Sequence, residues 1–204
     1  RFIDKEDGWL GKEPHHHIIN VTVSGAWWSG MPDERGIPHS IMTDGAPNGY
    51  SIISFDGAKY SLEFKAAGRS SAYQMQIDMP ESVSQTKLAA TKFHANVFNG
   101  SVRSVVEFRV DGDGPWRQME WTNSVDPMLA RTYQREAKVR EKLLAAGVER
   151  KDLPSEMSRP KRSTHLWQAS LPAELKVGQH YLEVRETGLN KQSVTGRRAF
   201  RVAP

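Results

Sequence analysis

The sequence predicts a mostly β fold: an antiparallel β-sandwich with one helical insertion at about 126–147. Short segments in which apolar and polar residues alternate recur along the chain, with turn residues between them. One segment alone has clear helical periodicity, and it lies between two of the predicted strands. The 204 residues are 38% hydrophobic and 25% charged, which is typical of a folded globular domain.

The clearest hairpin is predicted in the second half of the chain. Val106, Phe108 and Val110 alternate with charged residues, and Asp111-Gly112 then supplies a turn. Short strands with turns between them fit the whole pattern, and the chain turns at 188–190 before the last of them. They are predicted at 18–23, 50–55, 60–65, 73–77, 92–98, 104–110, 116–121, 165–171, from 178 and at 196–202.

The helix is marked by its ends. Asp126 suits the capping position, Pro127 suits the first helical position, and Gly147 suits the end of the helix. A short second helix is predicted near 151–157, so that the helical insertion extends over 126–162. The predicted apolar stripe consists of Leu129, Tyr133, Ala137 and Leu144.

The net charge of +4 is local. Residues 131–162 hold ten Lys and Arg and five Asp and Glu, or +5, which leaves −1 for the rest of the chain. Because acids alternate with bases, Glu136–Arg140 and Glu141 near Lys138 are predicted to be surface ion pairs. The segment therefore favours a solvated helix face, and we expect no nucleic-acid partner. The chain has no cysteine and no apolar run of the ~20 residues that span a membrane.

The segment 25–50 is the unusual part of the sequence. It holds five glycines, three prolines and the pair Trp27-Trp28, and a long loop of this kind is often functional. Adjacent residues of a strand face opposite sides, so we expect one tryptophan to enter the core and the other to face a ligand or neighbour. Trp9, Trp116, Trp121 and Trp167 are expected to fill the core or its rim, with an exposed platform for sugar as the alternative.

No catalytic residue and no metal site is predicted in this chain. The motifs of serine hydrolases, phosphate loops and dinucleotide sites are absent from the sequence. The triplet His15-His16-His17 favours packing or interface use, with metal binding as the alternative. Asp33, Asp44 and Asn48 favour turns, with cation binding as the alternative.

Several motifs together resemble one family, from about Trp9 to Val202. They include Gly8-Trp-Leu-Gly11, Pro14-His-His-His17, Gly25-Ala-Trp-Trp-Ser-Gly30, Asp33…Gly36-Ile-Pro38, Met42…Asp44-Gly45…Pro47-Asn-Gly-Tyr50, Lys65-Ala-Ala-Gly68, Tyr73-Gln-Met75, Asn96-Val-Phe-Asn-Gly100, Asp126-Pro127, His165-Leu-Trp167, Leu171-Pro172 and Gly178-Gln-His180. The combination resembles the C-terminal domain of bacterial calcineurin-like metallophosphoesterases. Residues of about 91–202 also have the pattern of an immunoglobulin- or fibronectin-like sandwich.

The resemblance implies a modular parent enzyme that carries two divalent metal ions in a separate catalytic domain. The D-x-H, G-D, G-N-H-[DE] and G-H-x-H motifs of that domain do not occur here. Residues 1–17 are then a linker that follows the catalytic domain, and 18–204 form one β-rich C-terminal domain. A start at Arg1 without Met agrees with this interpretation. The resemblance is also compatible with a periplasmic or secreted protein, although the sequence fixes no location.

The first hypothesis is a non-catalytic accessory domain that packs on the catalytic phosphoesterase domain of the same polypeptide and shapes its active-site rim. The alternative is a module that binds carbohydrate or an envelope polymer, and an unrecognised hydrolase is a third possibility. We expect no cofactor in this chain, and a small-molecule or glycan ligand stays unknown. The candidate interface or ligand-facing residues are His15, His16, His17, Trp27, Trp28, Asp33, Asp44, Asn48 and Tyr50.

Overall fold

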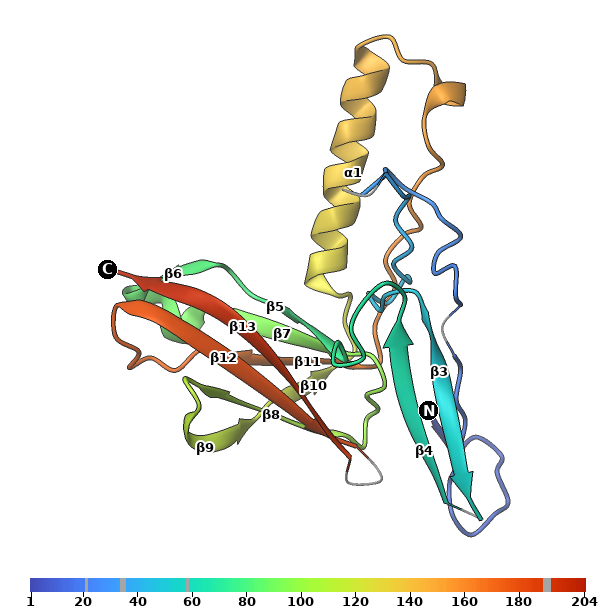
Figure 1. The fold of residues 1–204 in the computed structure, drawn as a ribbon, viewed down its shortest axis with the longest axis vertical. Coiled ribbons are helices and arrows are strands. Elements are labelled where there is room, and N and C mark those ends of the chain that lie inside the picture. Colours follow the sequence, from blue (N-terminus) through green and yellow to red (C-terminus); the bar gives the residue numbers. More distant parts are fainter. Residues whose placement is uncertain (21, 34–35, 58, 189–191) are drawn as a thin grey trace.

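The structure is a computed structural model that describes residues 1–20, 22–33, 36–57, 59–188 and 192–204. Its body consists of two facing sheets, as predicted (Figure 1). One sheet has the order β10-β11-β7-β5 and the other the order β6-β13-β12-β8-β9. Their bounds are β5 Met75–Asp78, β6 Ser82–Ser84, β7 Lys92–Val97, β8 Val105–Val110, β9 Asp113–Gln118, β10 Glu120–Thr122, β11 Leu166–Ser170, β12 Gly178–Thr187 and β13 Ser193–Ala203.

Strand pairing is antiparallel in both sheets, with one difference from the prediction. The short strand β6 runs parallel to the end of β13, where Val202 lies opposite Val83. A 3-10 helix, Gln85–Ala90, leads from β6 to β7. The predicted turn at 188–190 lies partly outside the described residues, and β12 and β13 pair on both sides of it.

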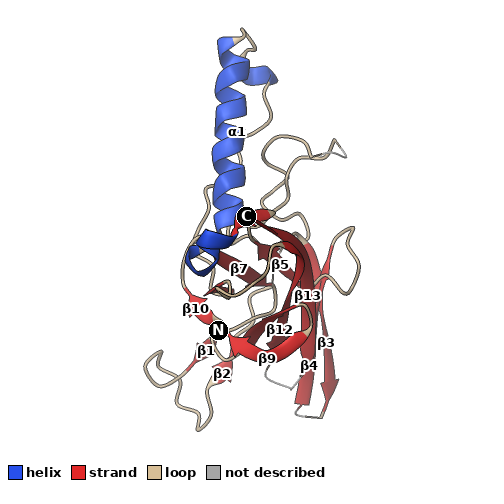
Figure 2. Cartoon of the chain, turned by 90° about the vertical axis from the view of Figure 1, so that its left-hand side faces the viewer, coloured by secondary structure: helices blue, strands red, loops and turns tan. Residues whose placement is uncertain are grey.

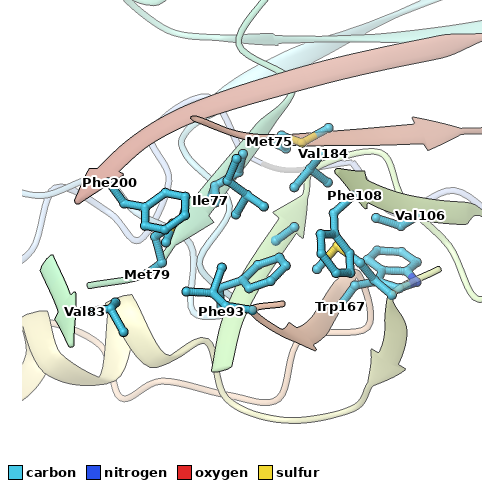
Figure 3. Packing of buried hydrophobic residues seen from close by; sticks show 14 of the residues in the cluster. Met75, Ile77, Met79, Val83, Phe93, Val106, Phe108, Trp167, Val184 and Phe200 are labelled. Carbon is cyan, nitrogen blue, oxygen red and sulfur yellow. The ribbon is translucent and has the colours of Figure 1, made fainter. Parts of the chain in front are cut away.

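The core lies between the two sheets (Figure 3). Phe93 of β7 and Phe108 of β8 meet edge to face, with ring centroids 5.0 Å apart and planes at 78°. Both side chains are almost fully buried, and Trp167 is buried beside them. The alternation seen in the sequence therefore places apolar side chains of both sheets in one core.

The predicted strand 116–121 is divided between the two sheets. Trp116 belongs to β9 of the five-stranded sheet, whereas Trp121 belongs to β10 of the other sheet. The buried Met119 lies between the two strands, and its backbone N–H donates to the carbonyl of Val106. The chain thus crosses from one sheet to the other at this residue.

The front of the chain lies outside the sandwich, which the sequence did not predict. Strands β3 (Gly49–Asp56) and β4 (Lys59–Ala66) form a separate two-stranded sheet beside it (Figure 1). A second small pair is β1 (Phe2–Ile3) with β2 (His15–His16). The strand predicted at 18–23 is wrong, because none of the described residues of this range is in a strand.

The helix α1 (Pro127–Ala145) has the predicted ends. The Asp126 carboxylate accepts the N–H of Leu129 at 3.0 Å, and Gly147 has a φ of 91°. The helix and the segment that follows it form an arm between β10 and β11, closed at its base by pairing of Val125 with Arg162. The arm projects from the body of the molecule (Figures 1 and 2). We refer to residues 126–162 as the arm.

The predicted apolar stripe of the helix is only partly buried. Leu129 is buried at the base, whereas Tyr133 and Leu144 are half-buried and Ala137 is exposed. These three side chains line a half-open cavity of about 290 Å³, together with Met31 and Met157. The short second helix is smaller than expected, since only Arg150–Asp152 adopts a 3-10 turn.

Candidate functional site

The loop 25–50 is held against the arm by a buried carboxylate. Glu136 is 9% exposed, its Oε2 accepts the backbone N–H of Met31 at 3.2 Å, and Nε2 of His39 lies 3.0 Å from its Oε1. The N–H of Gly30 also donates to the carbonyl of Ser155 in the returning part of the arm, at 2.8 Å. The loop is therefore fixed to the arm along the part that follows its two tryptophans.

This position of Glu136 corrects the predicted surface pairs. Arg140 does not pair with Glu136 but with Glu156, and it donates to the carbonyl of Pro154. The sequence carried a signal for the buried side, because Leu129, Thr132 and Glu136 follow the i, i+3, i+7 spacing of one helix face. The charge of Glu136 favours an exposed role, but its position on this face places it in the interior.

A second group of polar residues fixes the other end of the loop to the sandwich. Oδ2 of Asp44 lies 3.3 Å from Nε2 of His165, and the buried Asn96 side chain donates to the Asp44 carbonyl at 3.0 Å and to Asp126 at 2.7 Å. Burial by itself would raise the pKa of Asp44, but hydrogen bonds from His165 and the Ala46 N–H lower it. Asp44 is thus an ionised structural anchor of the loop.

Both Trp27 and Trp28 lie on the outside of the molecule. Trp27 is 81% exposed and Trp28 46% exposed, so the expectation that one of them enters the core is wrong. The reason is local: their φ values are 61° and 55°, and this left-handed backbone replaces the strand on which they would face opposite sides. The next residue returns to the interior, where the Ser29 hydroxyl donates to the carbonyl of Ala26 at 2.7 Å.

Large apolar side chains are unusually exposed in this part of the chain. Single exposed apolar residues are ordinary, but residues 19–55 supply eight of the sixteen in the described chain. Tyr50, a predicted site residue, is among them at 46%. We call these eight residues the N-terminal apolar set: Ile19, Val23, Trp27, Trp28, Tyr50, Ile52, Ile53 and Phe55.

The three histidines of the triplet contact other residues of the N-terminal part of the chain. The His16 ring stacks on Phe2 with centroids 4.6 Å apart, and its Nδ1 contacts the Tyr60 hydroxyl. Burial lowers the pKa of His16, and the nearby positive charges lower it further. His15 is exposed, with its ring 5.0 Å from that of Trp9, and His17 is exposed and pairs with Arg1 through the backbone.

Asn48 and Asp33 shape the loop. The Asn48 amide donates to the carbonyl of Val23 at 2.8 Å and its oxygen accepts from the Ser40 hydroxyl at 2.9 Å. The Asp33 carboxylate accepts the N–H of Ile37 at 3.2 Å, as in a turn. The predicted site residues thus do not meet at one point: some hold the loop, and the tryptophans and Tyr50 are presented on its surface.

Trp116 is covered by two guanidinium groups, those of Arg109 and Arg185, which lie 4.5 and 4.2 Å from the ring centroid. Arg109 and Arg185 are themselves paired with Glu183 and Glu107. A sugar would therefore compete with these two guanidinium groups for the Trp116 ring. Among the tryptophans, Trp27 and Trp28 are more exposed than Trp9 at 39% and Trp121 at 38%, whereas Trp167 is buried in the core.

The described residues contain no group of three or more His, Asp or Glu side chains that could hold a metal ion. The metal ions that a phosphoesterase family implies thus have no ligand set of this kind in the described part of the chain. Among the described helices, none is long and apolar enough to cross a membrane.

The chain was compared with known proteins. A family model, described as the C terminal of calcineurin-like phosphoesterase, matches residues 17–192. No curated protein and no solved structure gives a significant match. The matched range covers the loop, the whole arm and the sandwich as far as β12, and it ends just before β13. The chain therefore belongs to the family of C-terminal domains of calcineurin-like phosphoesterases.

Proposed function

We infer that this chain is a non-catalytic accessory domain that packs on the catalytic domain of a metal-dependent phosphoesterase and shapes access to its active site. One observation carries the proposal: two adjacent tryptophans are held outside the molecule by a loop that is anchored at both ends. Trp27 is 81% exposed, so a large apolar area lies in water, which is unfavourable in free energy. Burial of this side chain in an interface would be favourable.

The surrounding residues support a protein partner. The N-terminal apolar set continues from the loop into β3, where Tyr50, Ile52, Ile53 and Phe55 are all at least 42% exposed. The pair β3–β4 packs on the sandwich through a small cluster that contains Phe64 and Phe98. In the described part of the chain, no other strand pairs with β3 or β4. Tyr50 and Ile52 lie on one side of β3, and Ile53 and Phe55 lie on the other. Such a concentration of exposed apolar side chains is typical of a domain interface.

The test uses the two-domain parent enzyme, with and without residues 1–204. We expect deletion to change turnover, stability or substrate preference, and Trp27→Ser/Trp28→Ser to reproduce part of the change. Val102→Ser/Val177→Ser is the control, since these valines are 59% and 48% exposed elsewhere on the molecule. Unchanged turnover, stability and preference after deletion would overturn the proposal.

A second candidate, the binding of a carbohydrate or envelope polymer, is favoured by the same exposed tryptophans. Aromatic side chains that present their faces to water suit stacking on sugar rings. This function predicts that the chain alone binds soluble glycans and that Trp27→Ser/Trp28→Ser abolishes binding. The accessory role is favoured if the isolated chain binds no glycan while deletion of residues 1–204 still changes turnover, stability or substrate preference of the parent enzyme.

A further inference from the structure

The outer face of α1 carries a column of positive charge. Arg131, Arg135, Lys138 and Lys142 follow one another at spacings of four, three and four residues. At about 100° per residue, these spacings keep the four side chains within an arc of about 60°, over a length of about 16 Å. All four residues are exposed. We call these four residues the basic column.

The acids that alternate with these bases in the sequence do not lie in the column. Glu136 is buried on the opposite side of the helix, where its carboxylate accepts the N–H of Met31 and pairs with His39. Lys138 lies at one edge of the arc, and Glu141 lies about 60° beyond it around the helix axis, outside the arc. Acids and bases therefore alternate in the sequence of this segment, but they do not mix on this side of the helix.

Most cations of the basic column also have no carboxylate partner within the described part of the chain. Arg131 pairs with Asp78 at the base of the arm, but in the described part of the chain no carboxylate pairs with Arg135, Lys138 or Lys142. Four like charges on neighbouring turns repel one another, which costs helix stability unless an external anion compensates them. The self-repulsion and the lack of internal partners both point to an anionic partner outside the chain.

We propose that the basic column is a docking surface for anionic lipid headgroups. The column lies on the side of α1 that is turned away from the buried Glu136, and α1 projects from the body of the molecule (Figure 2). Val139, 41% exposed, lies beside the column and adds an aliphatic contact. The column contains no aromatic side chain for stacking on bases and does not lie in a groove, the two features that single-stranded nucleic acids use. Clusters of four or more Lys and Arg on a helix are typical of binding to acidic lipids.

The test is sedimentation of the full chain with vesicles of equimolar phosphatidylcholine and phosphatidylglycerol, against vesicles of phosphatidylcholine alone. We expect binding to the anionic vesicles only, and its loss at about 0.5 M NaCl, where the screening length falls to a few ångströms. The variant Arg135→Gln/Lys138→Gln/Lys142→Gln should lower the vesicle partition coefficient roughly 100-fold, from about 1 kcal/mol for each cation near the surface.

The control removes the same charge from elsewhere on the surface. Lys12→Gln/Lys87→Gln/Lys176→Gln takes three exposed lysines outside the arm and should change the partition coefficient by much less. Equal loss in the two variants, or equal binding to both kinds of vesicle, overturns the proposal. So does binding to soluble polyphosphate without binding to anionic vesicles, which would assign the column to a soluble polyanion. These measurements need no catalytic domain, so they can fail while the accessory function holds.

Discussion

At the scale of single residues, polar groups in this chain fix backbone segments. Glu136 holds the loop 25–50 to the arm, and Asp44, Asn96 and Asp126 hold it to the sandwich. Glu136, Asn96 and Asp126 are buried and Asp44 is half-buried. All four are hydrogen-bonded or ion-paired, which is the condition under which burial of a polar side chain is tolerated. The consequences can be measured at a histidine and at a glycine.

His180 should make folding stability depend on pH. Its Nδ1 lies 2.6 Å from Oδ2 of Asp111 and its Nε2 lies 2.7 Å from the Lys176 carbonyl, so both nitrogens face acceptors and both need a proton. Burial alone would lower the pKa of His180, but these hydrogen bonds raise it above 6.5. The folded chain then binds more protons than the unfolded chain between 6.5 and the raised pKa.

The stabilising effect of His180 is therefore complete below about pH 6.5 and is lost as the pH rises through the raised pKa. We expect the free energy of unfolding, measured with urea, to fall across this window in the natural chain. In His180→Gln this His180-dependent part of the fall should disappear. A pH dependence that is identical in the two proteins would show that the bonds to Asp111 and Lys176 do not stabilise the fold.

Gly45 should tolerate no side chain. Its φ is 91°, and an added Cβ would lie 2.6 Å from Nδ2 of Asn96 and 2.7 Å from Oδ2 of Asp126. Gly147 has the same φ with nothing within 4 Å of such a Cβ, which makes Gly147→Ala a matched control. We expect Gly147→Ala to cost about 1 kcal/mol of unfolding free energy through the left-handed backbone. Gly45→Ala should cost roughly 2 kcal/mol more, through the disturbed buried bonds. Equal losses in urea titrations would contradict this account.

At the scale of elements, the strands differ in how they are held. The pair β12–β13 lies inside a five-stranded sheet and buries Leu182, Val184, Phe200 and Val202. The pair β3–β4 has no further strand partner in the described structure, and most of β3 is exposed. Local opening costs least where few apolar contacts are lost.

Hydrogen exchange should reveal this difference. We expect the paired backbone amides of β3–β4 to exchange faster than those of β12–β13 in the isolated chain. In the two-domain enzyme, the proposed docking of the N-terminal apolar set should slow the exchange of β3–β4 selectively. Similar protection of the two pairs in the isolated chain would mean that the cluster of Phe64 and Phe98 stabilises β3–β4 as firmly as the sandwich core stabilises its strands.

At the scale of the whole molecule, stability rests on the core between the two sheets. Phe93 is completely buried and meets Phe108 across the sandwich, so Phe93→Ala removes a contact that joins both sheets. We expect a loss of about 3–5 kcal/mol in the unfolding free energy. Phe55→Ala, at a residue 75% exposed, should change it by less than about 0.5 kcal/mol. The two variants are compared by urea unfolding, and a small loss for Phe93→Ala would place the main core elsewhere.

Much of the fold could be predicted from the sequence because the signals are local. Asp126, Pro127 and Gly147 mark the helix ends, and the Asp111-Gly112 turn and the alternating residues before it mark a hairpin. Such patterns depend on neighbours in the chain, so one sequence displays them. Membership of the phosphoesterase C-terminal family could also be predicted, because the motifs occur in order along most of the chain. The immunoglobulin- or fibronectin-like similarity and the linker role of residues 1–17 stay predictions.

The position of the candidate surface was decided by the tertiary structure. Trp27 and Trp28 both face outward because the backbone turns left-handed at these residues, and distant anchors at Ser155, Glu136 and His165 hold the loop in place. The spacing of the four cations places the basic column on one side of α1, and the tertiary structure turns this side outward because Glu136, on the other side, binds the loop. The sequence by itself determined the elements and the family, since these depend on local period and motif order. Which side chains reach the surface depends on contacts between residues far apart in the chain, and only the folded molecule establishes those contacts.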